Sequence, residues 1–599
     1  MKKIVYVIFS LMVVAAAVAD DRIIQFVLSS GQHISIRLSD IASIRYDYHD
    51  QDSIDQAYQD SLERDQFIRD SLAREQFLRD SLYADSLHKA ELYQDSVAGT
   101  HTLNLMIDST TRFTLFSEAL HRTGLDDSLV NYRADSALLF KQLAREGYGS
   151  PLYPANGTGT TGTLFRRPGY TLFAESDSVL HANGINSIDD LIAYANNTYG
   201  QASQWYDHLS ANGINVSTGD DYTNRYNALN MFVAYHILKL KAHVAQLVYE
   251  KSIDPYWNYA PDADPYNYYE TMLPHTMLKV WEPAAEGRTL YLNRYRANNT
   301  LTDLAASQGS DAMHTVIRQG VKIARDKSVE ASNGYIHEID GVLVYDETVP
   351  HGVLNERMRF GVASLFPELI TNGFASCYTG DGNISYMYDT SRLGIPNGYF
   401  SNMKLYNSDI CIAYCLHGAW RCWQSSQIQA WGRTDFSVKL PPVPAGVYEV
   451  RITYARSSYN SHIEYSTGTN PNDTASFTLL REVDFSIHTG DPRIGLTDCT
   501  MEEDQGLASD KALRANGYMR APYSYCGHGE LGWSQTNNVR CEYGIGVMRI
   551  ILGTITVGSD DVWLHIKSQY PIYTPLGIDY VELCPVNVAD NDTYMEDWY

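Results

Sequence analysis

The chain has no cysteine before Cys377, although it is 599 residues long. All eight cysteines follow that point: Cys377, Cys411, Cys415, Cys422, Cys499, Cys526, Cys541 and Cys584. No two of them form the Cys-x-x-Cys pair that is typical of structural zinc sites. Disulfide bonds are therefore favoured over a metal site, although Cys411, Cys415, His417 and Cys422 lie near one another in sequence.

Basic residues are also scarce, with 46 Lys and Arg against 71 Asp and Glu, which gives a formal charge of −25. Binding to nucleic acid requires a basic surface that attracts the phosphate backbone. We therefore exclude a nucleic-acid partner.

Long apolar runs are absent after residue 19, so we expect no transmembrane segment. Residues 1–19 combine Lys2 and Lys3 with an apolar run from Ile4 to Val18 and small residues at Ala17–Ala19, which is the pattern of a secretory signal peptide. No cysteine follows this run, so lipoprotein processing is not indicated. We expect an exported protein that is periplasmic, outer-membrane-associated or extracellular.

The usual arrangements of catalytic residues are missing as well. The sequence has no His-Glu-x-x-His motif, and we can assemble no Ser/His/Asp set and no paired-carboxylate cleft from it. We therefore expect no enzymatic activity and no cofactor or metal ion.

A short β-hairpin is predicted after the signal peptide, in the segment 20–48. Two alternating apolar runs, Arg22–Leu28 and His33–Leu38, flank a turn that contains Gly31. An isolated hairpin is marginally stable in water, so we expect it to add to a partner sheet.

Glycine and proline are absent from residues 50–98, where charged residues recur with a ten-residue period. Acidic residues precede arginine by four positions, as in Asp65 and Arg69, which stabilises a helix. We predict a long helical stalk over 49–98. Its apolar stripe winds around the helix, which favours a solvated stalk over a coiled coil, with self-association through the stalk as the alternative.

The same segment repeats the pattern Asp-Ser-apolar. This pattern resembles the O-glycosylation site of exported proteins from Bacteroidetes bacteria. The alternative is that Asp-Ser simply belongs to the helical repeat. The candidate acceptors are Ser61, Ser71, Ser81, Ser86 and Ser96.

The stretch Asn333–Leu343, Asn-Gly-Tyr-Ile-His-Glu-Ile-Asp-Gly-Val-Leu, predicts a strand, a tight turn and a strand. We place the turn at Asn333–Gly334, because both residues tolerate positive φ. The stretch resembles the second signature motif of fasciclin (FAS1) domains, whose usual form is close to Asn-Gly-x-Ile-His-x-Ile-Asp-x-Val-Leu. The resemblance implies a mixed α/β domain over 105–347. Its motif residues here are Tyr235, His236, Asn333, Gly334, His337, Asp340 and Gly341.

Further stretches fit the same resemblance. Phe113–Leu125 is similar to the opening helix of the family, with Gly124 as the helix stop. Tyr170–Asp177 is similar to the first signature motif, except that Glu175 stands where the family usually has proline. Tyr269–Leu273 and Leu290–Arg294 resemble strands. Extra residues at 130–168, 197–225, 251–268 and 296–330 are interpreted as surface insertions.

Leu229–Leu238 resembles the helix that ends in the Tyr-His motif of the family. This motif is linked to integrin adhesion in animal members. In this chain Tyr235 and His236 lie inside an apolar run, which favours buried, structural side chains. We interpret His337 in the same way.

After the connector 348–379, apolar alternation predicts an all-β sandwich over 380–587, followed by an acidic tail at 588–599 that is expected to fray rather than hold calcium. The predicted strands are Asp409–Tyr414, Gln427–Trp431, Thr434–Leu440, Gly446–Tyr454, Gly546–Val557, Asp561–Lys567 and Leu576–Leu583. The run Gly577–Pro585 resembles the galactose-binding-like jelly rolls of carbohydrate-binding modules. Candidate residues for stacking on a sugar are Trp420, Trp423, Trp431 and Trp533, with core packing as the favoured alternative for each.

The predicted fold class is thus multidomain α+β: a FAS1 mixed α/β domain and then a jelly-roll-like sandwich, preceded by a hairpin and a helical stalk. This organisation indicates a non-catalytic, exported cell-surface adhesion or interaction protein whose partner is an unknown protein or glycan. The alternative is a polysaccharide-binding protein that acts through the sandwich.

Overall fold

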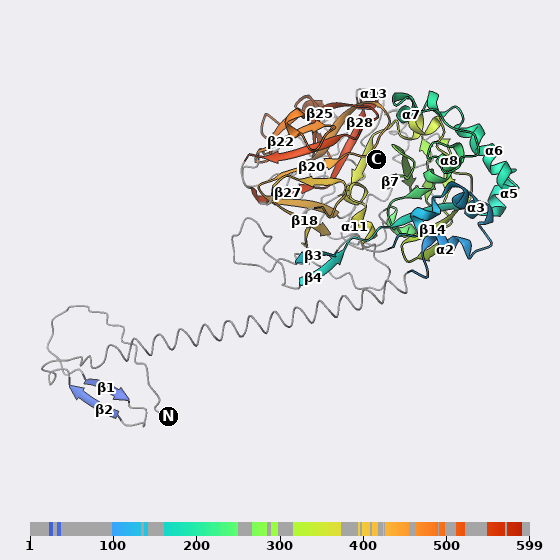
Figure 1. Ribbon diagram of the computed structural model, residues 1–599. Helices are drawn as coiled ribbons and strands as arrows, with labels where there is room; N and C mark the ends of the chain where they lie inside the picture. Colours follow the sequence, from blue (N-terminus) through green and yellow to red (C-terminus); the bar gives the residue numbers. More distant parts are fainter. Residues whose placement is uncertain are drawn as a thin grey trace. The chain divides into compact units, whose positions relative to one another are not determined.

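The computed structural model, shown in Figure 1, divides the chain into two compact units, Met1–Leu92 and Tyr93–Tyr599. The residues that the structure describes are 23–27, 33–37, 99–132, 137–141, 161–248, 266–283, 289–296, 316–372, 393–395, 398–407, 410–416, 423, 426–454, 462–488, 490–496, 511–521, 548–569 and 572–589.

In the first unit the structure describes a β-hairpin. Strands β1 (Ile23–Val27) and β2 (His33–Arg37) pair antiparallel, with Ile24 opposite Ile36 and Phe26 opposite Ile34. The hairpin prediction is confirmed. The predicted stalk, its serines Ser61, Ser71, Ser81, Ser86 and Ser96, and the signal peptide lie outside the described residues and stay predictions.

The second unit contains two parts, which we call the mixed lobe (residues 99–345) and the sheet lobe (residues 346–589). In Figure 1 helices α3, α5, α6 and α8 gather on one side of this unit, and strands β20, β22 and β25 lie on the other side. The mixed α+β class is therefore confirmed for the described residues.

A four-stranded sheet of order β13-β14-β5-β6 forms the centre of the mixed lobe. The two inner strands, β5 (Tyr170–Glu175) and β14 (Gly334–Ile339), run parallel, and nearly all of their residues are buried. Such continuous burial fits an inner strand that is covered on both faces. The outer strands are β13 (Val329–Ala331) and β6 (Ile237–Leu238).

The helices of the mixed lobe begin and end at residues with a clear local role. The predicted opening helix is α3 (Thr114–Thr123), and Gly124 ends it at φ 68°, a left-handed conformation that glycine adopts without strain. The Ser187 side chain caps α6 (Ile188–Tyr199), and Asn227 caps α8 (Ala228–Tyr235). All eight residues of α8 are buried, since it packs between α3 and α6.

A second four-stranded sheet extends the mixed lobe toward the sheet lobe. Its order is β12-β9-β8-β7, with bounds Val321–Lys322, Tyr291–Leu292, Met277–Trp281 and Tyr266–Glu270. Shorter elements of this lobe are α2 (Leu103–Asp108), α4 (Asp126–Leu129), α5 (Asp177–Ala182), α7 (Asp207–Ala211), β3 (Ala137–Lys141), β4 (Thr161–Phe165), β10 (Tyr295–Arg296) and β11 (Val316–Arg318).

The sheet lobe contains three antiparallel sheets within its described residues. The first has the order β15 (Met358–Gly361), β28 (Tyr580–Pro585), β21 (Gly446–Tyr454), β25 (Met548–Val557) and β24 (Tyr518–Arg520). The second is β17 (Met403–Leu405), β20 (Asp435–Lys439), β26 (Trp563–Ser568), β22 (His462–Gly468) and β23 (Thr478–Asp484). The third is β16 (Leu393–Ile395), β18 (Ile410–Leu416), β19 (Ser426–Gly432) and β27 (Ile572–Ile578).

Three details differ from the sequence prediction. The turn before β14 lies at Ser332–Asn333, and Gly334 is already the first strand residue, without positive φ. The run Leu576–Leu583 belongs to two strands, because the chain leaves β27 at Asp579 and enters β28. The connector 348–379 contains β15, which pairs with β28 and so belongs to a sheet.

One buried carboxylate organises the first sheet of the sheet lobe. Glu582 on β28 is fully buried and accepts hydrogen bonds from Arg359 and Arg549, with Arg451 and Arg357 at 3.6 and 3.7 Å. Burial by itself raises the pKa of Glu582, but the charges of the four arginines together lower it well below its ordinary value.

Candidate functional site

Asn333 and Gly334 of the signature motif join the central sheet to the first helices. Asn333 is buried; its Oδ1 accepts from the backbone N–H of Leu103 at 2.9 Å, and its Nδ2 donates to the carbonyls of Leu129 and Asn131. A Cβ on Gly334 would overlap the Leu103 side chain and the Tyr170 carbonyl. These residues therefore hold α2 and α4 against β14.

His337 lies on β14 with both ring nitrogens engaged. Nε2 donates to the carbonyl of Ala242 at 3.0 Å, so Nδ1 accepts from the Ser328 hydroxyl at 2.8 Å. Burial lowers the pKa of His337 to about 4, with a further contribution from His243. The ring is therefore neutral and has no atom left for a ligand.

His236 and Glu175 form a buried pair between α8 and β5. His236 Nδ1 donates to the carbonyl of Phe232, and Nε2 lies 2.9 Å from Glu175 Oε1, which also accepts from the backbone N–H of Leu343. Both side chains are fully buried. Glu175 replaces the proline that the fasciclin resemblance leads one to expect, and here it holds the histidine that follows α8.

The other three motif residues also contact the protein itself. The Tyr235 hydroxyl donates to the carbonyl of Met277 and accepts from Asn293 Nδ2 in the lobe interior. Asp340 is exposed and accepts from the backbone N–H of Lys322, and Gly341 follows it where β14 ends. The motif residues thus build the lobe and do not converge on a cavity.

The candidate sugar-stacking tryptophans require one correction. Trp423 is 1% exposed, and the guanidinium of Arg359 lies 4.2 Å from its ring centroid. Since the indole is covered in this way, Trp423 offers no face to a sugar. The side chains of Trp420, Trp431 and Trp533 lie outside the described part of the structure, so they stay predictions.

The cysteines remain open to the same extent. Cys584 is fully buried on β28, and the side chains of the other seven lie outside the described residues. The disulfide expectation is therefore still a prediction.

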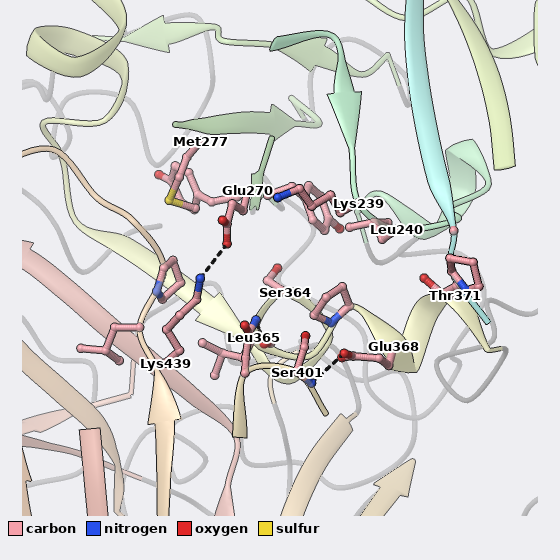
Figure 2. A pocket seen from close by; sticks show the side chains of 18 of the residues that line it. Lys239, Leu240, Glu270, Met277, Ser364, Leu365, Glu368, Thr371, Ser401 and Lys439 are labelled. Carbon is pink, nitrogen blue, oxygen red and sulfur yellow. Dashed lines mark hydrogen bonds and ion pairs between the residues drawn. The ribbon is translucent and has the colours of Figure 1, made fainter. Parts of the chain in front are cut away.

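A cavity of about 530 Å³ lies where the two lobes meet, and we call it the seam pocket (Figure 2). The mixed lobe contributes the loop 166–169 and residues of β7 and β8. The sheet lobe contributes residues from α10 (Val362–Leu365), α11 (Glu368–Thr371), β20 and β26. The size suits a small organic ligand, and clefts between such parts are common binding sites.

One wall of the seam pocket is an ion-pair network that joins the lobes. Lys439 at the end of β20 lies 3.4 Å from Glu270 at the end of β7 (Figure 2). It also lies 3.7 Å from Asp561. Because the pairs are partly exposed, we assign them a positioning effect of at most about 1 kcal/mol each.

The opposite wall carries polar atoms that are left over. Glu368 is 8% exposed, and its Oε1 accepts from the backbone N–H of Ser401 at 2.8 Å. Within the described residues, Glu368 Oε2 and the Ser364 hydroxyl have no hydrogen-bond partner. Figure 2 shows the Ser364 hydroxyl and the Glu270 carboxylate turned toward an open space, with the Glu368 carboxylate at its edge beside Ser401. Buried polar atoms are nearly always paired, so these two indicate a ligand or water in the pocket.

The remaining lining is partly apolar. Trp563 opens β26 and is partly exposed, and Pro441 lies beside it in the lining. The lining thus contains an aromatic residue as well as a hydroxyl and a carboxylate, and these are the kinds of group that hold a polyhydroxylated ring. Among the residues with described positions, no group of three potential metal ligands is found.

The seam pocket was not predicted from the sequence, because its residues come from segments far apart in the chain. One local signal was present. Glu368 is the only charged residue in the run Phe366–Ile370, where an acid is unexpected unless it has a role.

No family model and no curated protein matches this sequence. Among the described helices, none is both long and apolar enough to cross a membrane.

Proposed function

We propose that this protein is an exported, non-catalytic interaction protein that holds a polyhydroxylated ligand, such as the end of a glycan, in the seam pocket. The observation that carries the proposal is the pair of unsatisfied polar atoms, Glu368 Oε2 and Ser364 Oγ, in a lining that also contains the partly exposed Trp563. Sugar hydroxyls donate and accept, so one ring can pair with both atoms while its apolar face lies on the indole.

The proposal extends to the two lobes. The mixed lobe would be a fasciclin-type domain, supported by helices and strands at the positions that the resemblance implies. The sheet lobe would be a galactose-binding-like sandwich, supported by its antiparallel sheets. In this proposal the glycan is bound between the lobes, whereas the sequence pointed to the tryptophans of the sandwich alone.

The proposal includes no chemical step. Glu270 and Asp561 are the other carboxylates of the lining, and the ammonium group of Lys439 engages both. Glu368 then acts as a hydrogen-bond acceptor, which is enough for recognition.

The test is binding of the exported chain, residues 20–599, to a panel of host, plant and bacterial glycans. Replacing Trp563 with Leu should weaken binding at least about tenfold, and Ser364→Ala about fivefold, because one stacked ring and one hydrogen bond are lost. Ser210→Ala, an exposed serine on α7, is the matched control and should change nothing.

Two results would contradict the proposal. Either no glycan binds, or a glycan binds with equal affinity to the wild type and to the Trp563 and Ser364 variants. The first result would leave adhesion through a protein partner as the function that the fasciclin resemblance supports.

A further inference from the structure

We propose that the ligand of the seam pocket carries a protonated amine, and that the Glu368 carboxylate binds it, as it would bind an amino sugar. This inference rests on the proposed function and names the ligand class. It follows from the charge of the unsatisfied group, which is a carboxylate rather than a second hydroxyl or an amide.

Glu368 is held through only one of its two carboxylate oxygens. Its Oε1 is fixed by one backbone N–H, that of Ser401 at 2.8 Å, and its Oε2 has no partner in the described part of the chain. The residue is 8% exposed, so water solvates the carboxylate poorly. A buried carboxylate is stabilised most by a cation that also donates a hydrogen bond.

Four cationic side chains already line the seam pocket. Lys439 interacts with Glu270 and Asp561, Arg166 donates to the carbonyls of Gly398 and Tyr399, and Arg167 donates to the carbonyl of Tyr132. Lys239 follows β6 and is exposed. Among the described residues no ion pair joins Glu368 to any of these cations, so a ligand cation would supply the missing charge.

The second unsatisfied atom of the lining restricts which ligand group fits next to the amine. The Ser364 hydroxyl is the neighbouring unsatisfied atom, and it can pair with a hydroxyl next to the amine. An amine flanked by a hydroxyl on a six-membered ring is the arrangement of an amino sugar. A charge-assisted hydrogen bond is about twice as strong as a neutral one, so the free amine should be preferred over an acetylated or hydroxyl equivalent.

The experiment compares three oligosaccharides of equal length, made of glucosamine, N-acetylglucosamine and glucose, by calorimetric titration of the exported chain. We expect the glucosamine oligomer to bind at least about tenfold more tightly than the other two. Glu368→Gln, which keeps the shape and removes the charge, should abolish this preference and leave glucose-oligomer affinity within about twofold. Glu330→Gln, at a side chain that is 65% exposed, is the matched control and should leave all three affinities unchanged.

A measurement on the wild type alone keeps the test valid even if Glu368→Gln does not fold. As the pH rises and the ligand amine loses its proton, affinity for the glucosamine oligomer should fall, whereas affinity for the glucose oligomer should not. Equal affinities for all three oligomers, or an equal loss for all three in Glu368→Gln, would overturn the amine assignment while the pocket proposal stands. Binding of none of these oligomers and of no glycan in the panel would overturn both.

Discussion

Replacing Glu582 with Gln should destabilise the sheet lobe strongly. The carboxylate accepts three hydrogen bonds at 2.8–3.1 Å, two from Arg359 and one from Arg549, and all three side chains are fully buried. Glutamine keeps the size and one acceptor oxygen but removes the charge that these two arginines contact directly. Removing one partner of a buried ion pair costs about 3–5 kcal/mol, because the other charge stays buried without compensation.

The assay is urea unfolding followed by tryptophan fluorescence, with the free energy of unfolding taken by linear extrapolation. The matched control is Glu330→Gln, which removes the same charge from a pair with Lys241 whose acid is 65% exposed. This control should cost less than about 1 kcal/mol. If Glu582→Gln costs no more than Glu330→Gln, the view that this carboxylate holds the arginines in place is refuted.

Glu582 should also affect how the stability of the fold depends on pH. Since the folded-state pKa of Glu582 is lowered, its contribution to stability is fully present above the ordinary carboxyl pKa. The contribution is lost as the pH falls from that range toward the lowered pKa. The acid-induced loss of stability between about pH 5 and pH 2 should therefore be shallower in Glu582→Gln than in the wild type.

Two further predictions concern the mixed lobe. His337 has a pKa lowered to about 4, so below the ordinary histidine pKa the folded state binds fewer protons than the unfolded state. As the pH falls from about 6.5 to about 4, the free energy of unfolding should therefore decrease by up to about 1.4 kcal/mol per pH unit. His337→Gln should flatten this slope, measured by urea unfolding at several pH values. Gly334→Ala should cost about 1–3 kcal/mol or prevent folding, because the added methyl group meets a backbone carbonyl. The control Gly219→Ala, where the nearest atom is 3.8 Å away, should change stability by less than about 1 kcal/mol. Equal costs of the two variants in thermal unfolding would contradict this packing argument.

Local patterns predicted much of the secondary structure. Strands β18, β19, β20, β21, β25 and β26 followed from apolar alternation, whereas β22 and β23 of the same lobe were not predicted. Helix α3 followed from its apolar face and from Gly124 at its end. The turn before β14 was placed one residue too late, because Asn-Gly is a strong turn signal on its own. The reason that Gly334 is glycine lies in its neighbours: Leu103 and Tyr170 leave no room for a Cβ, and this crowding exists only after folding.

The candidate site could not be predicted from sequence patterns. Its walls come from β7, α10, α11, β20 and β26, and no spacing in the chain shows that these elements meet. Trp423 was a candidate for sugar stacking with core packing as the favoured alternative, and the structure places it in the core. Whether an indole faces solvent depends on what covers it, and the residue that covers it, Arg359, lies in a segment that the sequence suggested was only a connector.

The position of β28 has a consequence for how the chain matures. This strand, Tyr580–Pro585, lies between β15, from the beginning of the sheet lobe, and β21, from its middle. The first sheet cannot close until residue 585 has joined it, and the Glu582 carboxylate reaches Arg359 and Arg549 only then. Because β28 is the last strand of the described chain, this lobe can complete its first sheet only after residue 585 has been synthesised.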